Sequence, residues 1–280
     1  MEAQTSHLKS AFLIKASPAW RTVDLAELWR YRELLYFFVW RDVKVRYKQT
    51  ALGIAWAVIQ PLFAMLMFVA IFGRVARLPS DGAPYSLFAY SGLLPWMFFS
   101  NAFNAGAASL FGSTQLVTKV YFPRILIPVS AVSTALVDFL LASVMLVPLL
   151  LIGHVVPSPE ALVGIPLAMA VCLLVTVGLA IWGSALVVRY WDLRHVIPFV
   201  VQIWLFATPV IYPLSMVPVH WRWAVRLNPI APVVEIFRGS IFGRPLDMVA
   251  LGGATLTGIV LIATGSIYFR RVERTFADII

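Results

Sequence analysis

The chain has 280 residues, of which 61% are hydrophobic and 12% are charged, about half the charged share of an ordinary soluble protein. This composition excludes a globular domain with one membrane anchor and indicates a helical protein that crosses the bilayer several times. The formal net charge is +9. Because the cations adjoin apolar runs, anionic membrane lipids rather than nucleic acid are their expected counterions.

Residues 1–50 are predicted to form a cytosolic segment ending in an amphipathic helix over about 24–49. Lys and Arg share one arc of this helix, leucines lie opposite, and aromatic residues flank both, which is typical of a helix in the headgroup layer. A soluble surface helix would explain the cations but not the aromatic residues. Asp42 and Arg46 interrupt the apolar side, and their spacing predicts an ion pair. The candidate interface residues are Arg41, Lys44, Arg46 and Lys48.

Six apolar runs predict an all-α membrane domain over 51–270, followed by a cytosolic tail, 271–280. The expected spans cover about 51–73, 85–110, 125–153, 161–188, 196–212 and 249–269. The cations before the first run place its start in the cytoplasm. With both termini inside, 16 Lys and Arg fall inside and 6 outside, in keeping with the positive-inside rule. Asn101 and Asn104 interrupt the second run, which should end early or face other helices.

The segment 213–248 is too long for a turn and too apolar for a solvated loop. Prolines at 213, 218, 229 and 232 divide it into short pieces, and Trp221 and Trp223 favour an interfacial depth. We expect short re-entrant helices on the outer side, with their backbone satisfied by packing on protein.

The sequence lacks the common motifs for nucleotide binding, metal binding and catalysis. The sequence has no GxxxxGK[ST] loop, so it cannot cradle a nucleotide in the usual way, and its four histidines are scattered. We therefore expect no catalytic residue, no metal site and no cofactor on this chain. The lone Cys172 is expected to be a packing residue. Energy for transport would come from a partner protein or from ion coupling.

Asp138 is the clearest ionisable residue inside a predicted span. It could hydrogen-bond a neighbouring Ser, Asn or Tyr, or pair with an Arg near the interface. A proton relay is a weaker alternative, because no intramembrane His, Lys or Glu accompanies it.

Two short connectors, 114–128 and 188–198, mix charges with aromatic residues. They could be ordinary cytoplasmic loops with interfacial Tyr and Trp. They could also form a docking surface for a soluble partner, since Tyr, Trp and Arg commonly anchor interfaces.

Four stretches of the sequence carry a resemblance to a known family. They are RYKQTALGIAWAVIQPL (46–62), TKVYFPRILIP (118–128), RYWDLRHVIPFVVQIWLFATPVIYP (189–213) and LNPIAPVVEIFRGSIFG (227–243). The chain resembles, from about residue 28 onward, the permease subunit of type-2 ATP-binding-cassette exporters. It is most similar to permeases for undecaprenyl-linked polysaccharides such as O-antigen and teichoic acid. Trp191 stands where this family would have Arg.

The resemblance implies a homodimer in the inner membrane that works with two copies of a separate ATPase, which binds ATP and Mg. It implies an interface helix at 28–48, a coupling helix around 113–124 and outer gate helices at 213–244. The candidate residues for coupling to the ATPase are Lys119, Tyr121, Phe122, Arg124, Asp192 and Arg194. Some members of an aromatic set are expected to line a channel between the subunits: Trp56, Phe63, Tyr90, Trp96, Phe99, Phe103, Trp204 and Tyr212.

Three alternatives stay open at this point. The same architecture could export a capsule polymer, a drug or a lipid. A self-contained secondary transporter or channel would need no ATPase and would depend on Asp138. An enzyme acting on lipid-linked sugars is disfavoured, because no acidic or His cluster is placed at either interface.

Overall fold

The computed structural model describes residues 29–48, 53–113 and 122–273, and this part of the chain contains helices and no strand. The elements, in chain order, are α2 (Arg32–Lys48), α3 (Ala55–Phe68), the π-helical η1 (Val69–Val75), α4 (Tyr85–Gly112), α6 (Leu126–Ser143), α7 (Leu146–Ile152), α8 (Ala161–Arg189), α9 (Leu193–Ala207), the 3₁₀ turns η2 (Leu214–Met216) and η3 (Val219–Trp221), α10 (Arg222–Leu227), α11 (Ile230–Phe242) and α12 (Met248–Glu273).

Four helical stretches in the described residues are long and apolar enough to cross a membrane. They are Ala55–Val75, Leu126–Ile152, Ala161–Arg189 and Met248–Glu273. Two further spans were predicted from the sequence. One corresponds to α4, which has 28 residues but carries polar ones such as Asn101 and Asn104. The other corresponds to α9, an apolar helix of only 15 residues, about 22 Å long at 1.5 Å per residue.

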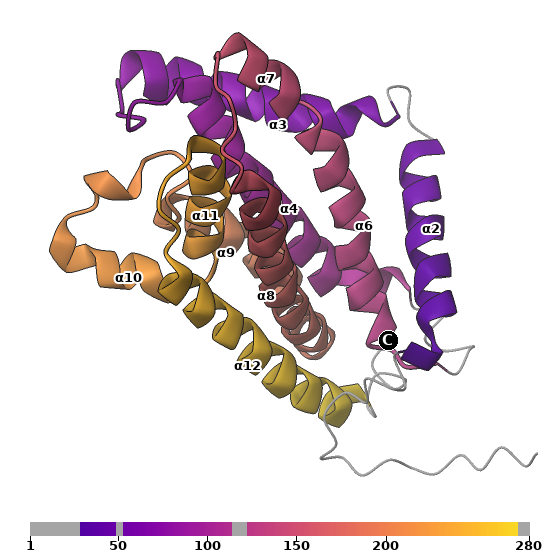
Figure 1. The fold of residues 1–280 in the computed structure, drawn as a ribbon. Coiled ribbons are helices and arrows are strands. Elements are labelled where there is room, and N and C mark those ends of the chain that lie inside the picture. Colours follow the sequence, from indigo (N-terminus) through magenta and orange to yellow (C-terminus); the bar gives the residue numbers. More distant parts are fainter. Residues whose placement is uncertain (1–28, 49–52, 114–121, 274–280) are drawn as a thin grey trace, which may run out of the picture.

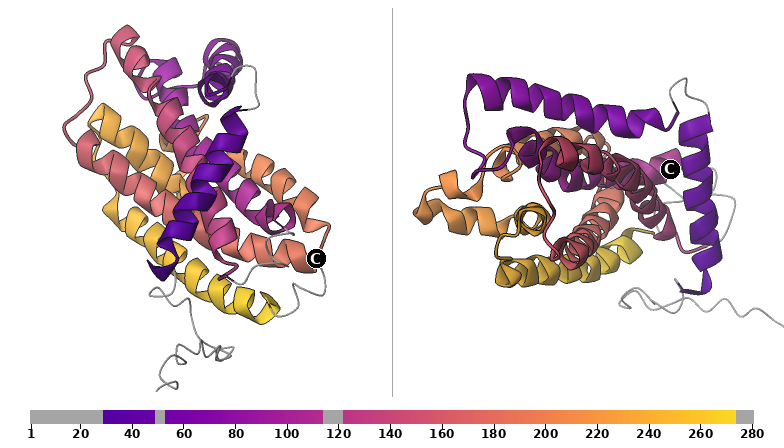
Figure 2. Two further views of the ribbon diagram at one scale, coloured as in Figure 1. Left: turned by 90° about the vertical axis from the view of Figure 1, so that its right-hand side faces the viewer. Right: turned by 45° about the horizontal axis from the view of Figure 1, so that its top comes forward.

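The centre of the bundle is α8, which packs against α4, α11 and α12 (Figures 1 and 2). Close helix packing needs small residues where backbones approach each other. A Cβ atom added to Gly178 of α8 would lie 2.7 Å from the Leu261 Cβ of α12, and one on Gly106 of α4 would lie 2.6 Å from the Ala180 Cβ of α8. Cys172 is fully buried in this core, as expected for a packing residue.

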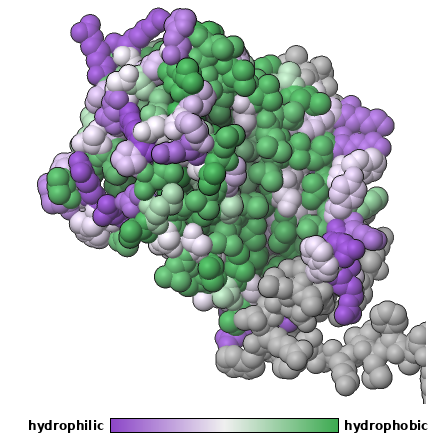
Figure 3. Space-filling view, in the orientation of Figure 1, coloured by the Kyte–Doolittle hydropathy of each residue, from purple (hydrophilic) through white to green (hydrophobic). Residues whose placement is uncertain are grey.

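α2 lies at the edge of the bundle, beside α6, and α3 runs across the opposite end of the molecule from α12 (Figure 1). Apolar residues cover most of the face seen in Figure 3, and hydrophilic residues gather at its margins. An apolar band with polar margins is the surface expected of a protein that sits in a bilayer. The first residues of the predicted amphipathic helix, 24–28, and its last, 49, lie outside the described residues.

Between α9 and α12 the chain forms η2, η3, α10 and α11 rather than one long loop. Pro213, Pro218 and Pro229 each stand immediately before one of these short helices, where a missing backbone N–H costs nothing. α11 is capped at its C-terminus by Gly243, whose φ of +64° suits a glycine. α11 is buried against α8 and α4, whereas α10 extends to the side of the molecule (Figure 1).

Candidate functional site

The first part of the candidate site is an apolar cluster where α2, α4, α6, α8 and α12 converge. We call this the basic end of the bundle, because Arg41 lies over the Phe38 ring, Arg124 bonds the end of α12, and Arg270 and Arg271 lie in the last turn of α12. Phe122 is 5% exposed, and its ring meets that of Phe38 edge-on, with centroids 5.4 Å apart. Leu110, Ile181 and Phe269 complete the contact between helices. The predicted coupling residue Phe122 is therefore buried among the chain's own helices.

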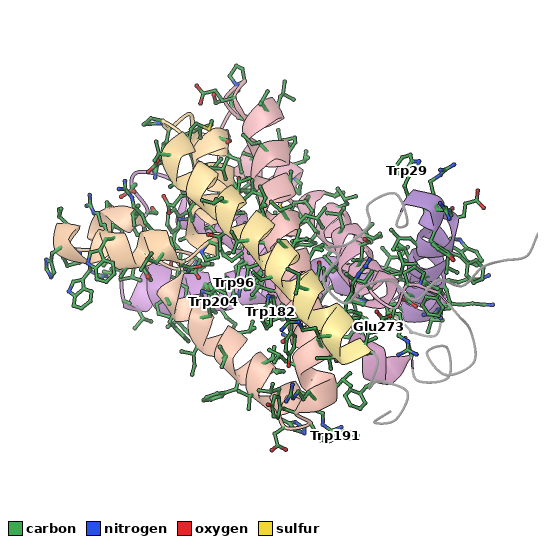
Figure 4. The ribbon with its side chains drawn as sticks, turned by 90° about the horizontal axis from the view of Figure 1, so that it is seen from below. Trp29, Trp96, Trp182, Trp191, Trp204 and Glu273 are labelled. Carbon is green, nitrogen blue, oxygen red and sulfur yellow. The ribbon has the colours of Figure 1, made fainter. Side chains whose placement is uncertain are left out.

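Arg124, another predicted residue of the first connector, extends this contact. Arg124 donates a hydrogen bond from Nη1 to the carbonyl oxygen of Glu273, at 2.8 Å. Glu273 ends α12 (Figure 4), so this bond fastens the start of α6 to the end of α12. Lys119 and Tyr121 lie outside the described residues.

The second connector meets the last turn of α4 through Trp191. Its ring lies edge-on to that of Phe111, near the end of α4, with centroids 4.6 Å apart. The guanidinium of Arg194 lies 4.5 Å from the Trp191 ring centroid, and Asp192 and Arg194 are exposed. Trp191 projects from the turn before α9 (Figure 4). The residue that departs from the resemblance thus joins the second connector to the end of α4, and the unusual aromatic residue was itself the sign of this contact in the sequence.

A second contact holds α2 against the bundle through Asp138 of α6. Its carboxylate accepts hydrogen bonds from the Arg46 guanidinium and from the Tyr47 hydroxyl. Burial, together with the bond to Asp138, raises the pKa of the Tyr47 phenol above its usual range. Asp138 thus has the two kinds of partner proposed from the sequence, a tyrosine and an interfacial arginine.

The predicted pair between Asp42 and Arg46 is wrong. Asp42 instead pairs with Arg41 at 2.8 Å, and Arg46 turns toward α6, where it pairs with the carboxylate of Asp138, which is less exposed than that of Asp42. Lys44 lies over the ring of Trp40, 4.4 Å from its centroid, and Lys48 is exposed.

Half of the proposed channel-lining set lies in the core of the subunit. Tyr90, Trp96, Phe99 and Phe103 are all buried, and the ring of Phe99 packs edge-on against Trp204 at 5.1 Å. Figure 4 shows Trp96 and Trp204 near each other inside the bundle. These four can reach a path between subunits only if helices move apart, because α4 is packed between α8 and α6 and the four side chains are buried there.

The rest of the set reaches the surface of the subunit. Trp56 is 46% exposed and Phe63 is 63% exposed, both on α3. Trp204 and Tyr212, on and after α9, are half-buried. The faces that could line a path are therefore on α3 and α9.

Sequence reasoning missed Arg238 of α11, which is 1% exposed. Its guanidinium donates to the carbonyl oxygens of Pro209 and Val210 at 3.0 and 2.8 Å, and it pairs with Glu235 at 3.3 Å. It also lies 3.7 Å from the ring centroid of Phe88. One side chain thus joins α11, α4 and the chain after α9. The sequence did contain a sign of this buried pair, since Glu235 and Arg238 are three residues apart in an apolar helix.

Comparison with known sequences places this arrangement among transport proteins. The sequence model of the family described as ABC-2 type transporter matches residues 33–242. The chain is 29% identical to the O-antigen export system permease protein RfbA of Klebsiella pneumoniae, over 89% of this chain and 95% of that protein. It is 31% identical to the RfbA protein of Myxococcus xanthus, over 90% of this chain and 97% of that protein. It is also 21% identical to the polysialic acid transport protein KpsM of Escherichia coli, over 83% and 91% of the two chains.

Proposed function

Because this chain belongs to the ABC-2 type transporter membrane family, we propose that it is the permease subunit of an ATP-driven exporter that moves a lipid-linked polysaccharide across the inner membrane. The observation that carries this proposal is its likeness, along nearly the whole chain, to permeases named for O-antigen export. A capsule-type polymer is the second candidate cargo, supported by the weaker likeness to KpsM.

The proposed topology has six spans, with α4 and α9 added to the four long apolar stretches. Both termini and the basic end then face the cytosol, and η2, η3, α10 and α11 lie on the outer side as re-entrant gate helices. The positive-inside rule supports this orientation, since 16 of the 22 Lys and Arg fall on the cytosolic side. Anionic lipid headgroups would meet the cations of α2.

The energy for export comes, in this proposal, from two copies of a separate ATPase that binds ATP and Mg. The sequence offers no phosphate-binding loop of its own. The exposed Trp191, Asp192 and Arg194, together with the first connector, would dock this partner, because clustered aromatic and Arg side chains are typical interface anchors.

Two copies of the chain would form the path. α9 leaves Phe199, Ile203 and Phe206 exposed along one face, and α3 leaves Trp56 and Phe63 exposed. Pairing α3 and α9 faces across a homodimer would enclose a conduit with aromatic walls. Undecaprenyl would stay in the lipid while the sugar chain entered the conduit.

Force from the ATPase would reach α2 through the contact between Phe122 and Phe38 and through the ion pair between Arg46 and Asp138. A rigid contact between packed rings transmits displacement because a protein core is close-packed. The two halves of the path would then rock apart.

Reconstitution in sealed vesicles tests the function. With the ATPase and ATP supplied on the cytosolic side, lipid-linked polysaccharide should become protected inside vesicles that contain the inverted complex. Without nucleotide, or without the ATPase, no protection should appear. Transport by the pure permease driven by an ion gradient would reject the proposal in favour of a secondary transporter.

Replacing Phe38 by alanine should reduce export at least several-fold while ATP hydrolysis by the complex continues. The change removes the ring that packs against Phe122, at a cost of roughly 3 to 5 kcal/mol to local packing, so displacement at the connector no longer reaches α2. The matched control is Phe37→Ala, since Phe37 is the adjacent residue but 54% exposed. Equal export by the two variants, measured per ATP hydrolysed in the same vesicles, would contradict this route of coupling.

A further inference from the structure

The structure contains a cavity beside the proposed export path, with which it shares Trp56. It has a volume of about 410 Å³ and lies where the end of α2 and the start of α3 meet α4 and α6. Small-molecule sites in proteins have volumes of roughly 300 to 1,000 Å³, so the cavity is large enough for a compact ligand. Gln60 and Asn101 line it and are exposed, so the cavity opens at the surface of the subunit.

Hydrogen-bonding groups converge on this cavity from two helices. Gln60 comes from α3, and Asn101 and Asn104 come from successive turns of α4. Asn104 Oδ1 is buried and accepts no hydrogen bond from the described residues. Buried polar atoms in folded proteins are nearly always paired, so this acceptor calls for a donor from beyond the described residues, such as a ligand in the cavity. An amide placed in a membrane domain without a partner is costly, and it commonly marks a functional site.

The remaining walls restrict the chemistry of the ligand. Trp56 and Phe98 give the cavity aromatic surface, which binds apolar faces. Among the described residues that line it, charge comes from Arg46 and Asp138, and these two neutralise each other in an ion pair. A phosphate would find no unpaired cation there. A neutral ligand with many hydroxyl groups and an apolar C–H face would find both acceptors and donors.

We propose that this cavity binds one pyranose ring of the exported glycan before the ring enters the conduit. This inference rests on the proposed function, because it takes the polysaccharide as cargo. The amides of Gln60, Asn101 and Asn104 would bind hydroxyl groups, and Trp56 would cover the C–H face. Asn101 and Asn104 make α4 less apolar as a membrane span, and binding of the sugar would explain why polar residues stand at these positions.

The test measures binding of two probes to the full-length permease in lipid nanodiscs. The first is undecaprenyl pyrophosphate that carries the polymer, and the second is undecaprenyl pyrophosphate without sugar. Asn104→Leu should weaken binding of the first probe about tenfold, the cost of losing a hydrogen bond to a buried group, and Gln60→Leu, at an exposed position, should weaken it by a smaller factor. Binding of the second probe should not change. Ala108→Leu is the matched control, because it adds the same leucine at an exposed position of α4, one turn from Asn104 and outside the cavity.

Each other outcome overturns the proposal. If the variants weakened binding of both probes equally, the cavity would bind the pyrophosphate or lipid part that the probes share. Unchanged binding in both variants, each checked for an unaltered melting profile, would mean that no sugar occupies the cavity. The same follows if the wild-type permease binds both probes equally. Export by the wild-type complex is measured in parallel, so a rejected cavity with intact export leaves the proposed function standing, whereas loss of wild-type export rejects the function itself.

Discussion

Arg238→Met should lower the free energy of unfolding by roughly 3 to 5 kcal/mol, the usual cost of removing one partner from a buried ion pair. Methionine fills similar space but leaves the carbonyl oxygens of Pro209 and Val210 without donors and Glu235 without its cation. α11 would then lose its attachment to the chain after α9. Detergent-solubilised protein, unfolded by denaturant and followed by tryptophan fluorescence, gives the measurement.

Two further variants sharpen this test. Arg244→Met removes a partly exposed pair with Asp81, which is worth about 1 kcal/mol or less. Arg238→Lys keeps the charge, but a single ammonium cannot reproduce the planar fork that reaches both carbonyls. The loss in free energy of unfolding should therefore be smaller than for Arg238→Met and larger than for Arg244→Met. If Arg238→Met were no more harmful than Arg244→Met, the buried guanidinium would not be what holds α11 in place.

Gly178→Ala should destabilise the bundle by about 1 to 3 kcal/mol, as overpacking does in a close-packed core. The added Cβ would lie 2.7 Å from the Leu261 Cβ and 3.1 Å from the Ile262 backbone nitrogen, so α12 must move away from α8. The loss should appear as a lower unfolding midpoint in detergent.

The control is Gly253→Ala in α12, where an added Cβ meets nothing within 4 Å. Alanine favours a helix over glycine by up to about 1 kcal/mol, so this variant should be neutral or stabilised. The two substitutions add the same methyl group yet should differ in the sign of their effect. A stabilising Gly178→Ala would show that α8 and α12 are not in close contact in the folded protein.

Much of the fold could be read from the sequence because a bilayer restricts the chain so strongly. Long apolar runs must become helices, since no water is present to satisfy backbone groups. The helices found at 126–152, 161–189 and 248–273 begin and end within a few residues of the predicted runs at 125–153, 161–188 and 249–269. α9 differs more, because it ends at Ala207 and Thr208 is already extended.

The site was less accessible to sequence reasoning, because it depends on which faces meet. Aromatic residues on α4 look the same whether they face a conduit or the core, and the structure buries Tyr90, Trp96, Phe99 and Phe103. The pair expected between Asp42 and Arg46 failed for the same reason. Local spacing cannot reveal that a carboxylate 92 residues away, that of Asp138, competes for Arg46.

By itself, the sequence determined that this is an all-helical membrane protein without a nucleotide loop, and its stretches at 46–62, 118–128, 189–213 and 227–243 indicated the permease family. Composition and hydropathy are properties of the individual residues, so they can be evaluated without knowing how the helices pack. Only the tertiary structure decided that Phe122 lies against Phe38, that Trp191 packs against Phe111 of α4 and that Arg238 joins α11 to the chain after α9. Such contacts join residues far apart in the chain, and they are set by how helices pack, which no local pattern specifies.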